Sequence, residues 1–133
     1  MEYDIYNFLL EVDKDFPTPL SNKVNLEEYA DKLQRCAVIF KATCGTTIMG
    51  MVAMYCNDTT SKSAYIPLVA TKKDYRGLGI GKSLIGGAVC FARKKGLKKI
   101  GIHTENPNAL KLYASLGFKL IDDDIRKYLE LEL

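Results

Sequence analysis

The chain has 133 residues, a length that suits one hydrophobic core better than two, so we expect a single domain over residues 1–133. Hydrophobic residues make up 47% of the chain and charged residues 26%, which is typical of a folded protein and argues against disorder. The 19 basic and 16 acidic side chains leave a net charge of +3, a surplus too small to predict a nucleic-acid partner.

The start of the sequence lacks the features of a targeting segment. Residues 1–4 contain no basic region, and no stretch approaches the roughly 18 apolar residues of a membrane span. We therefore expect a cytoplasmic protein with no membrane partner. The cysteines show no C-x-x-C spacing, so we expect no metal site and interpret them as reduced and mostly buried. They are Cys36, Cys44, Cys56 and Cys90.

The first quarter of the chain predicts two helices joined by a loop. Apolar residues are dense over residues 3–10, which favours a short helix, and Pro17 and Pro19 then interrupt the chain. Asn25 is a good N-cap for a second helix over residues 26–34, whose apolar side chains share one side. The segment between the helices is expected to be a surface loop.

Three consecutive antiparallel strands are predicted next. Residues 36–40, 47–56 and 64–71 are rich in apolar and β-branched side chains, and polar turn residues separate them. Pro67 lies inside the third segment. Because proline cannot donate a hydrogen bond to the ladder, we expect an interruption or a bulge there.

Helices and strands alternate in the remainder of the chain. Apolar residues spaced by three and four predict a helix over residues 79–95 that Gly96 ends. A strand over residues 98–103 and a helix over residues 106–116 follow, and the last segment holds two β-like stretches. The predicted order is α/α/β/β/β/α/β/α/β/β, with no internal repeat.

A glycine-rich loop lies between the third strand and the long helix. Its glycines allow a ligand to approach the backbone closely, and the first amides of a helix are unpaired and lie at the positive end of its dipole. A pyrophosphate could therefore be held by the main chain alone. The candidate residues are Arg76, Gly77, Leu78, Gly79, Ile80, Gly81 and Lys82.

Two other phosphate-binding motifs do not fit this loop. A nucleotide-triphosphate P-loop requires a glycine five residues before Gly81, where this chain has Arg76. A dinucleotide fingerprint that begins at Gly77 or Gly79 would place its last glycine at Lys82 or Leu84. The remaining alternative is a tight turn that binds no ligand.

A second motif, Asn106-x-x-Ala109-x-x-x-Tyr113-x-x-x-Gly117-Phe118, follows about one strand and one helix later. Together with Arg76-x-x-Gly79-x-Gly81 it resembles the GCN5-related N-acetyltransferase (GNAT) family, from about Phe8 to the C-terminus. The resemblance implies an α/β fold of the α+β type: a mixed, mostly antiparallel sheet of about six strands flanked by four helices. Residues 1–7 leave little room for the family's first strand, so an N-terminal edge strand is expected to be absent.

The resemblance also implies an acyl-coenzyme A-dependent enzyme that transfers an acetyl group from acetyl-coenzyme A to a primary amine, without a metal. By resemblance to the family, the backbone of Val69 and Thr71 would form hydrogen bonds with the pantetheine arm, and Asn106 would contact the same arm. Arg76 and the amides of residues 78–82 would bind the pyrophosphate.

Tyr113 is the candidate general acid. The resemblance places its hydroxyl near the thioester sulfur, and a phenol stays protonated at neutral pH, so it can protonate the departing thiolate. Packing on the buried face of a helix is the alternative role for this side chain.

The candidate base departs from the family pattern. The family often places a Glu on the strand before the glycine loop or on the next strand, but residues 64–69 contain no carboxylate and Gly101 stands at the second position. His103, the only histidine, lies two residues beyond Gly101 and so on the same strand face, and its ordinary pKa near 6.5 suits proton removal. Glu105 and water are the alternative bases, and a structural role near the end of the strand is the alternative for His103.

The acceptor is not determined by these motifs. Residues 15–21 and the helix that carries Tyr29 are expected to shape its site, which suits an amino sugar, a small-molecule amine or a peptide amine. Two other functions are carried as alternatives: a noncatalytic coenzyme A-binding protein and a nucleotide-binding regulatory module. A homodimer is compatible with each of them.

Overall fold

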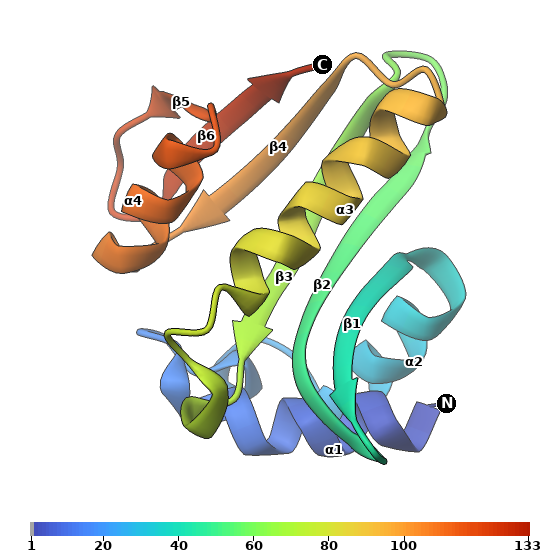
Figure 1. Cartoon of the computed structure of the whole chain (residues 1–133), viewed down its shortest axis with the longest axis vertical. Helices are drawn as coiled ribbons and strands as arrows, with labels where there is room; N and C mark the ends of the chain where they lie inside the picture. Colours follow the sequence, from blue (N-terminus) through green and yellow to red (C-terminus); the bar gives the residue numbers. More distant parts are fainter. Residues whose placement is uncertain (1) are drawn as a thin grey trace.

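The computed structural model describes residues 2–133, with side chains from residue 5 onward. Its centre is a six-stranded sheet with the strand order β1-β2-β3-β4-β6-β5 (Figure 1). The strands are β1 (Val38–Cys44), β2 (Thr47–Asp58), β3 (Ser63–Thr71), β4 (Lys99–Thr104), β5 (Lys119–Asp122) and β6 (Lys127–Glu132). The helices are α1 (Glu2–Val12), α2 (Leu26–Cys36), α3 (Ile80–Lys94) and α4 (Pro107–Ser115), with short 3-10 turns η1 (Asp13–Asp15), η2 (Leu20–Asn22) and η3 (Lys73–Tyr75).

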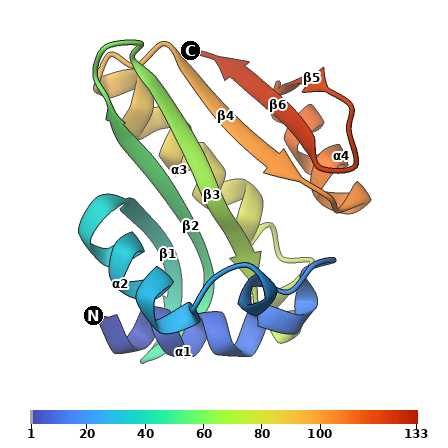
Figure 2. The same ribbon diagram turned by 180° about the vertical axis from the view of Figure 1, so that it is seen from behind.

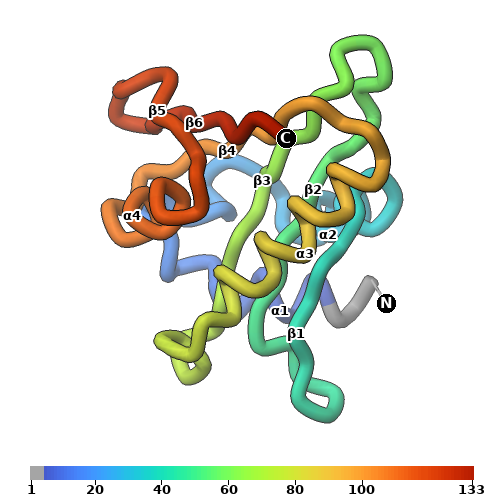
Figure 3. Tube along the Cα trace, turned by 45° about the horizontal axis from the view of Figure 1, so that its top comes forward, coloured from blue at the N-terminus to red at the C-terminus, as the bar shows by residue number. Residues whose placement is uncertain are grey.

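The pairing of the strands confirms the predicted α+β fold. Neighbouring strands are antiparallel except β3 and β4, which run parallel because α3 crosses over between them. The hairpin turns after β1 and after β2 project from opposite ends of the sheet (Figure 3). Among residues 2–133 no strand precedes α1, so β1 forms one edge of the sheet, as expected.

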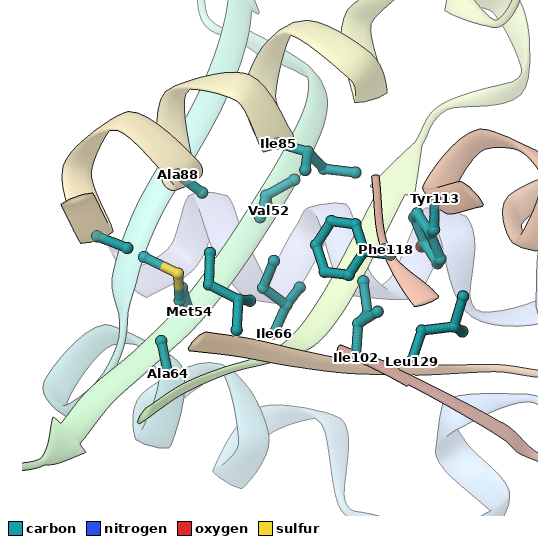
Figure 4. Close-up of a cluster of buried hydrophobic side chains, with 12 residues drawn as sticks. Val52, Met54, Ala64, Ile66, Ile85, Ala88, Ile102, Tyr113, Phe118 and Leu129 are labelled. Carbon is teal, nitrogen blue, oxygen red and sulfur yellow. The ribbon is translucent and has the colours of Figure 1, made fainter. Parts of the chain in front are cut away.

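Helices cover both faces of the sheet, as the two opposite views show (Figures 1 and 2). On one face, α1 and α2 bury Phe8 and Leu33 against Met51 of β2. On the other face, α3 buries Ile85 against Val52 (Figure 4). Successive residues of β2 thus point to opposite faces of the sheet, as strand geometry requires, and β2 is buried on both faces.

The N-terminus of α2 shows why this helix begins where the sequence predicts. Asn25 has extended backbone angles, and its side-chain oxygen accepts a hydrogen bond from the amide of Glu28 at 3.0 Å. Glu27 and Glu28 occupy the first turn, where acidic groups complement the helix dipole. The buried side chains Leu26, Ala30 and Leu33 form the apolar stripe toward the sheet.

Pro67 marks a β-bulge, as predicted. Ala53 pairs with Leu68 and Tyr55 pairs with Tyr65, so β3 uses one residue more than β2 between these pairs. The extra residue reverses the alternation of faces. Ile66 therefore points into the α3 side of the core, whereas Leu68 points into the α1 and α2 side.

Beyond the bulge, β3 and β4 separate. Their parallel pairing extends only from Ser63 and Lys99 to Ile66 and Ile102, although β3 continues to Thr71. The carboxyl-terminal ends of both strands therefore diverge (Figures 1 and 2). This separation exposes the backbone edge of β3.

The expectation that the cysteines are mostly buried is wrong. Cys44 and Cys90 are exposed, and Cys36 and Cys56 are only partly covered. Apolar sequence neighbours did not imply burial, because Cys44 ends β1 at a hairpin turn and Cys90 lies on the solvent side of α3.

Candidate active site

A cavity of about 580 Å³ lies where β3 and β4 diverge. Its walls come from the ends of both strands, the glycine loop, the first turn of α3, one side of α4 and the loop between α1 and α2. Every candidate catalytic and coenzyme-binding residue from the sequence except Leu78 lines it, whereas Tyr29 and the rest of α2, which were expected to shape the acceptor site, do not. Leu78 is 70% exposed and does not line the cavity.

The glycine loop has the backbone geometry that its sequence suggests. Gly77 and Gly79 have φ angles of 81° and 78°, in the left-handed region that favours glycine. Gly79 is the N-cap of α3, and the first helical bond runs from the amide of Ser83 to its carbonyl. The amides of Ile80, Gly81 and Lys82 therefore lack an intrahelical acceptor at the cavity wall. This arrangement fits an anion.

Arg76 is held at the rim of the cavity. Its Nε donates to the carbonyl of Thr71 at 3.1 Å, and its Nη2 lies 2.9 Å from the Asp15 carboxylate. Both charged side chains are partly exposed, at 49% and 33%, and such a pair contributes at most about 1 kcal/mol. Arg76 can therefore exchange Asp15 for a phosphate at little cost.

The open edge of β3 offers further backbone groups. The amide of Lys72 donates to the carbonyl of Met49 at 2.8 Å, so Lys72 and, two residues earlier, Ala70 turn their backbone groups toward β2. Because antiparallel strands alternate in this respect, Val69 and Thr71 turn theirs toward the side that β4 has left. An extended ligand arm could pair with them there.

Asn106 has a structural partner that sequence reasoning did not assign. Its side-chain oxygen accepts from the amides of Asn108 at 2.8 Å and Ala109 at 3.4 Å, so it caps α4. The backbone amide of Asn106 donates to Thr104 Oγ1 at 3.0 Å. The side-chain amino group remains for a ligand in the cavity.

Tyr113 lies on the buried side of α4, near the ring of Phe118 (Figure 4). Burial raises the pKa of its phenol well above the ordinary value. Among residues 5–133, whose side chains are described, no buried side-chain nitrogen or oxygen is without a partner, and no residue there donates to or accepts from this hydroxyl. Tyr113 lines the cavity, and its raised pKa keeps the phenol protonated at neutral pH, so it can serve as a proton donor.

His103 also lines the cavity, near the end of β4. Its Nδ1 is 2.7 Å from the hydroxyl of Tyr65, and its ring centroid is 4.7 Å from that of Tyr128. Burial lowers its pKa, and the nearby Arg126 guanidinium lowers it further, so the imidazole is neutral at pH 7.

The structure explains why glycine stands at position 101. A Cβ there would overlap the hydroxyl oxygen of Tyr128. That hydroxyl donates to Glu130 at 2.9 Å, and the same carboxylate oxygen is 3.2 Å from Lys99 Nζ. The space in which a side chain at 101 would lie is therefore filled from β6.

Gly101→Ala is expected to destabilise the fold by about 1–3 kcal/mol, because the added methyl group forces Tyr128 to move. The cost should be smaller in a Tyr128→Phe background, since the closest atom is the hydroxyl oxygen that this change removes. Urea unfolding of the four members of this double-mutant cycle measures the difference. An equal cost in both backgrounds would contradict this explanation of Gly101.

Glu105 holds the loop that closes one side of the cavity. One carboxylate oxygen accepts from Thr18 Oγ1 at 3.0 Å, and the other lies 3.6 Å from Lys23 Nζ. Within the same loop, Asp13 accepts from the amide and hydroxyl of Ser21, which lowers its pKa. Because both oxygens of Glu105 have partners, the geometry favours His103 over Glu105 as a base.

Within residues 2–133, none of the helices combines the length and the apolar composition that a membrane-spanning helix requires. Among the side chains of residues 5–133, His, Cys, Asp and Glu nowhere form a group of three or more that could hold a metal ion.

Several known proteins are similar to this chain in sequence or in structure. The chain is 34% identical over 77 residues to an uncharacterised N-acetyltransferase of Methanocaldococcus jannaschii, a stretch that covers 53% of this chain and 34% of that relative. A GNAT-family acetyltransferase structure from Desulfovibrio desulfuricans superimposes with a TM-score of 0.80 at 15% identity, over 98% of this chain and 91% of the other.

A second solved structure is the PaiA N-acetyltransferase of Thermoplasma acidophilum, which is in complex with coenzyme A. It gives a TM-score of 0.76 at 16% identity, over 99% of this chain and 94% of that one. At such identities the two structures show the fold alone. The model of the acetyltransferase (GNAT) family matches residues 3–118, however, and the chain therefore belongs to that family.

Proposed function

We propose that the protein transfers an acetyl group from acetyl-coenzyme A to a primary amine by direct attack of the amine on the thioester. One observation carries this proposal: a single cavity brings the open edge of β3, the unpaired amides of α3 and the hydroxyl of Tyr113 together. The three features match the three parts of the donor, namely its extended arm, its pyrophosphate and its reacting sulfur.

The donor-binding residues in this proposal are those of the β3 edge and the glycine loop. Val69 and Thr71 pair with the amides and carbonyls of the pantetheine arm through their backbone. The amides at the start of α3 hold the pyrophosphate, with Arg76 and Lys82 as flanking cations. Asn106 contacts the arm from the opposite wall through its side-chain amino group.

Two side chains handle the protons. The neutral imidazole of His103 takes the proton that the attacking amine loses, and the phenol of Tyr113 donates one to the departing thiolate. The two residues line the same cavity, on β4 and α4 respectively. Attack and departure are thus served by separate groups, and Tyr113 regains its proton from water.

The acceptor is a primary amine of a small molecule, an amino sugar or a peptide. Its binding region is the part of the cavity beside the α1–α2 loop, where Phe16, Pro17 and Thr18 form the wall; Arg126, on the β5–β6 turn, also lines the cavity. Incubating the protein with acetyl-coenzyme A and each amine class, while measuring thiol release, tests the proposal directly.

A binding measurement separates this function from its alternatives. Coenzyme A should raise the melting temperature in a concentration-dependent manner, whereas ATP and GTP should do so much less, because the loop lacks the P-loop glycine. Equal stabilisation by the three ligands would favour a nucleotide-binding module. Coenzyme A binding without thiol release toward any amine would favour a noncatalytic protein.

His103→Gln is expected to lower kcat by about 10²-fold and to abolish the acidic limb of the pH–rate profile. In the wild type, activity should fall as the pH drops through the pKa of His103, which lies below 6.5, because the imidazolium cannot accept a proton. Glutamine is polar but does not titrate, so residue 103 can no longer cause a fall in activity at low pH. Stopped assays across the pH range measure the effect, and the calorimetric affinity for coenzyme A is the control. An unchanged acidic limb would mean that water, and not His103, removes the proton from the amine.

A further inference from the structure

Two tyrosines enclose His103 on the sheet face that looks away from α3. Tyr65 of β3 pairs with Gly101, and Tyr128 of β6 pairs with His103 itself. The ring centroids of Tyr65 and Tyr128 lie 5.6 Å and 4.7 Å from that of His103. Since residue 101 has no side chain, the Tyr128 ring occupies the space beside the imidazole. The imidazole is therefore held from both neighbouring strands.

The two nitrogens of His103 have different surroundings. Nδ1 is engaged by the Tyr65 hydroxyl at 2.7 Å. Nε2 makes no hydrogen bond within the described residues, and His103 lines the active-site cavity. Tyr65 itself does not line that cavity, and its direct link to the site is the hydrogen bond to His103.

The direction of the Tyr65–His103 hydrogen bond decides whether His103 can act as a base. A neutral imidazole carries one proton, and the partner of one nitrogen determines which tautomer is present. If the phenol donated to Nδ1, the proton would sit on Nε2 and no lone pair would face the amine. If Nδ1–H donates to the phenol oxygen, the lone pair of Nε2 faces the cavity.

We propose that Tyr65 is a positioning residue whose phenol oxygen accepts the Nδ1–H of His103 and thereby keeps Nε2 unprotonated toward the acceptor amine. The proposal rests on the acetyltransferase function proposed above. When the amine attacks, its N–H proton moves to Nε2, and the imidazolium that forms donates through Nδ1 to Tyr65. This bond is stronger when the donor is charged, so it stabilises the protonated base.

The other charged groups around His103 act in both directions. Arg126, on the turn before β6, disfavours the imidazolium, whereas Asp122 at the end of β5 favours it. Glu130 and Lys99 pair with each other beyond the hydroxyl of Tyr128, and both are partly exposed. Among the residues with described side chains, Tyr65 alone bonds directly to the imidazole, so its removal should give a separable effect.

Nuclear magnetic resonance can observe the tautomer, because the chain contains one histidine and its imidazole signals need no assignment. In the tag-free wild-type protein above the His103 pKa, the proton should reside on Nδ1 and not on Nε2. In Tyr65→Phe it should move toward Nε2, and the imidazole pKa should fall by about one unit because the imidazolium loses its acceptor. Tyr55→Phe removes another half-buried hydroxyl of this face and is the matched control.

The kinetic consequence has a defined sign. Tyr65→Phe should lower kcat at least about tenfold and shift the acidic limb to lower pH, since a weaker base is protonated only at lower pH. Tyr55→Phe should change neither. A proton on Nε2 in the wild type, or an acidic limb that Tyr65→Phe leaves in place, would overturn the proposal. If no amine is acetylated, the enzymatic function fails, while the tautomer measurement still decides how Tyr65 and His103 interact.

Discussion

Replacing Tyr113 by phenylalanine is expected to lower kcat by about 10²–10⁴-fold while the affinity for coenzyme A stays nearly constant. The ring and its packing beside Phe118 are retained. The phenol has no hydrogen-bond partner within the described residues, so removing it leaves no buried polar group unsatisfied. The expected loss is therefore one of proton donation and not of stability.

The leaving thiol provides an independent check on this role. An acyl donor with a more acidic thiol needs less protonation as it departs, so the difference between wild type and Tyr113→Phe should shrink with such donors. Urea unfolding and calorimetry with coenzyme A establish that fold and binding are intact. Near-normal turnover of acetyl-coenzyme A by the variant, under conditions in which chemistry limits the rate, would leave Tyr113 as a packing residue. Tyr55→Phe again serves as the control for loss of a hydroxyl.

The features that local sequence determines were predicted well. The cap at Asn25, the bulge at Pro67 and the glycine-rich start of α3 each depend on the backbone preferences of one or a few adjacent residues. Hydrophobic periodicity located the long helix for a similar reason, since it needs only one face to be buried. The resemblance to the family then supplied the arrangement of these elements.

Contacts between distant segments were not predictable in this way. Tyr65 and Tyr128 flank His103 only because the register of three strands places them there, and neither carries a motif. Asp15 reaches Arg76 and Thr18 reaches Glu105 across separations of 61 and 87 residues. A signal did exist at Gly101: a glycine inside a buried strand indicates that another group approaches closely. The identity of that group required the fold.

The local backbone and the space around each glycine also make Gly81 the best position at which to test the donor site. Gly79 has a left-handed φ, so any side chain there strains the backbone and confuses folding with binding. Gly81 has no such angle, and a Cβ added to it would meet Leu112 at 3.8 Å and Thr71 at 3.9 Å, which are ordinary contacts. A substitution at Gly81 should therefore fold.

Gly81→Asp is expected to bind coenzyme A about 10³-fold more weakly and yet to be at least as stable as the wild type. A carboxylate about 4 Å from a phosphate charge, at an effective dielectric constant near 20, costs roughly 4 kcal/mol, which corresponds to that factor. The first turn of α3 contains no acidic residue, and an added one complements the helix dipole by up to about 1 kcal/mol.

Gly81→Asn separates charge from size in this test. It has nearly the same volume as the aspartate but no charge, so it should lose much less affinity and should show little dependence on salt, whereas the Asp variant should recover some affinity as salt screens the repulsion. Lys82→Ala should weaken binding only modestly, because the main chain supplies most donors. Calorimetry with coenzyme A and thermal unfolding measure the two opposite effects. Coenzyme affinity that survives in a folded Gly81→Asp protein would show that the pyrophosphate is not bound at the start of α3.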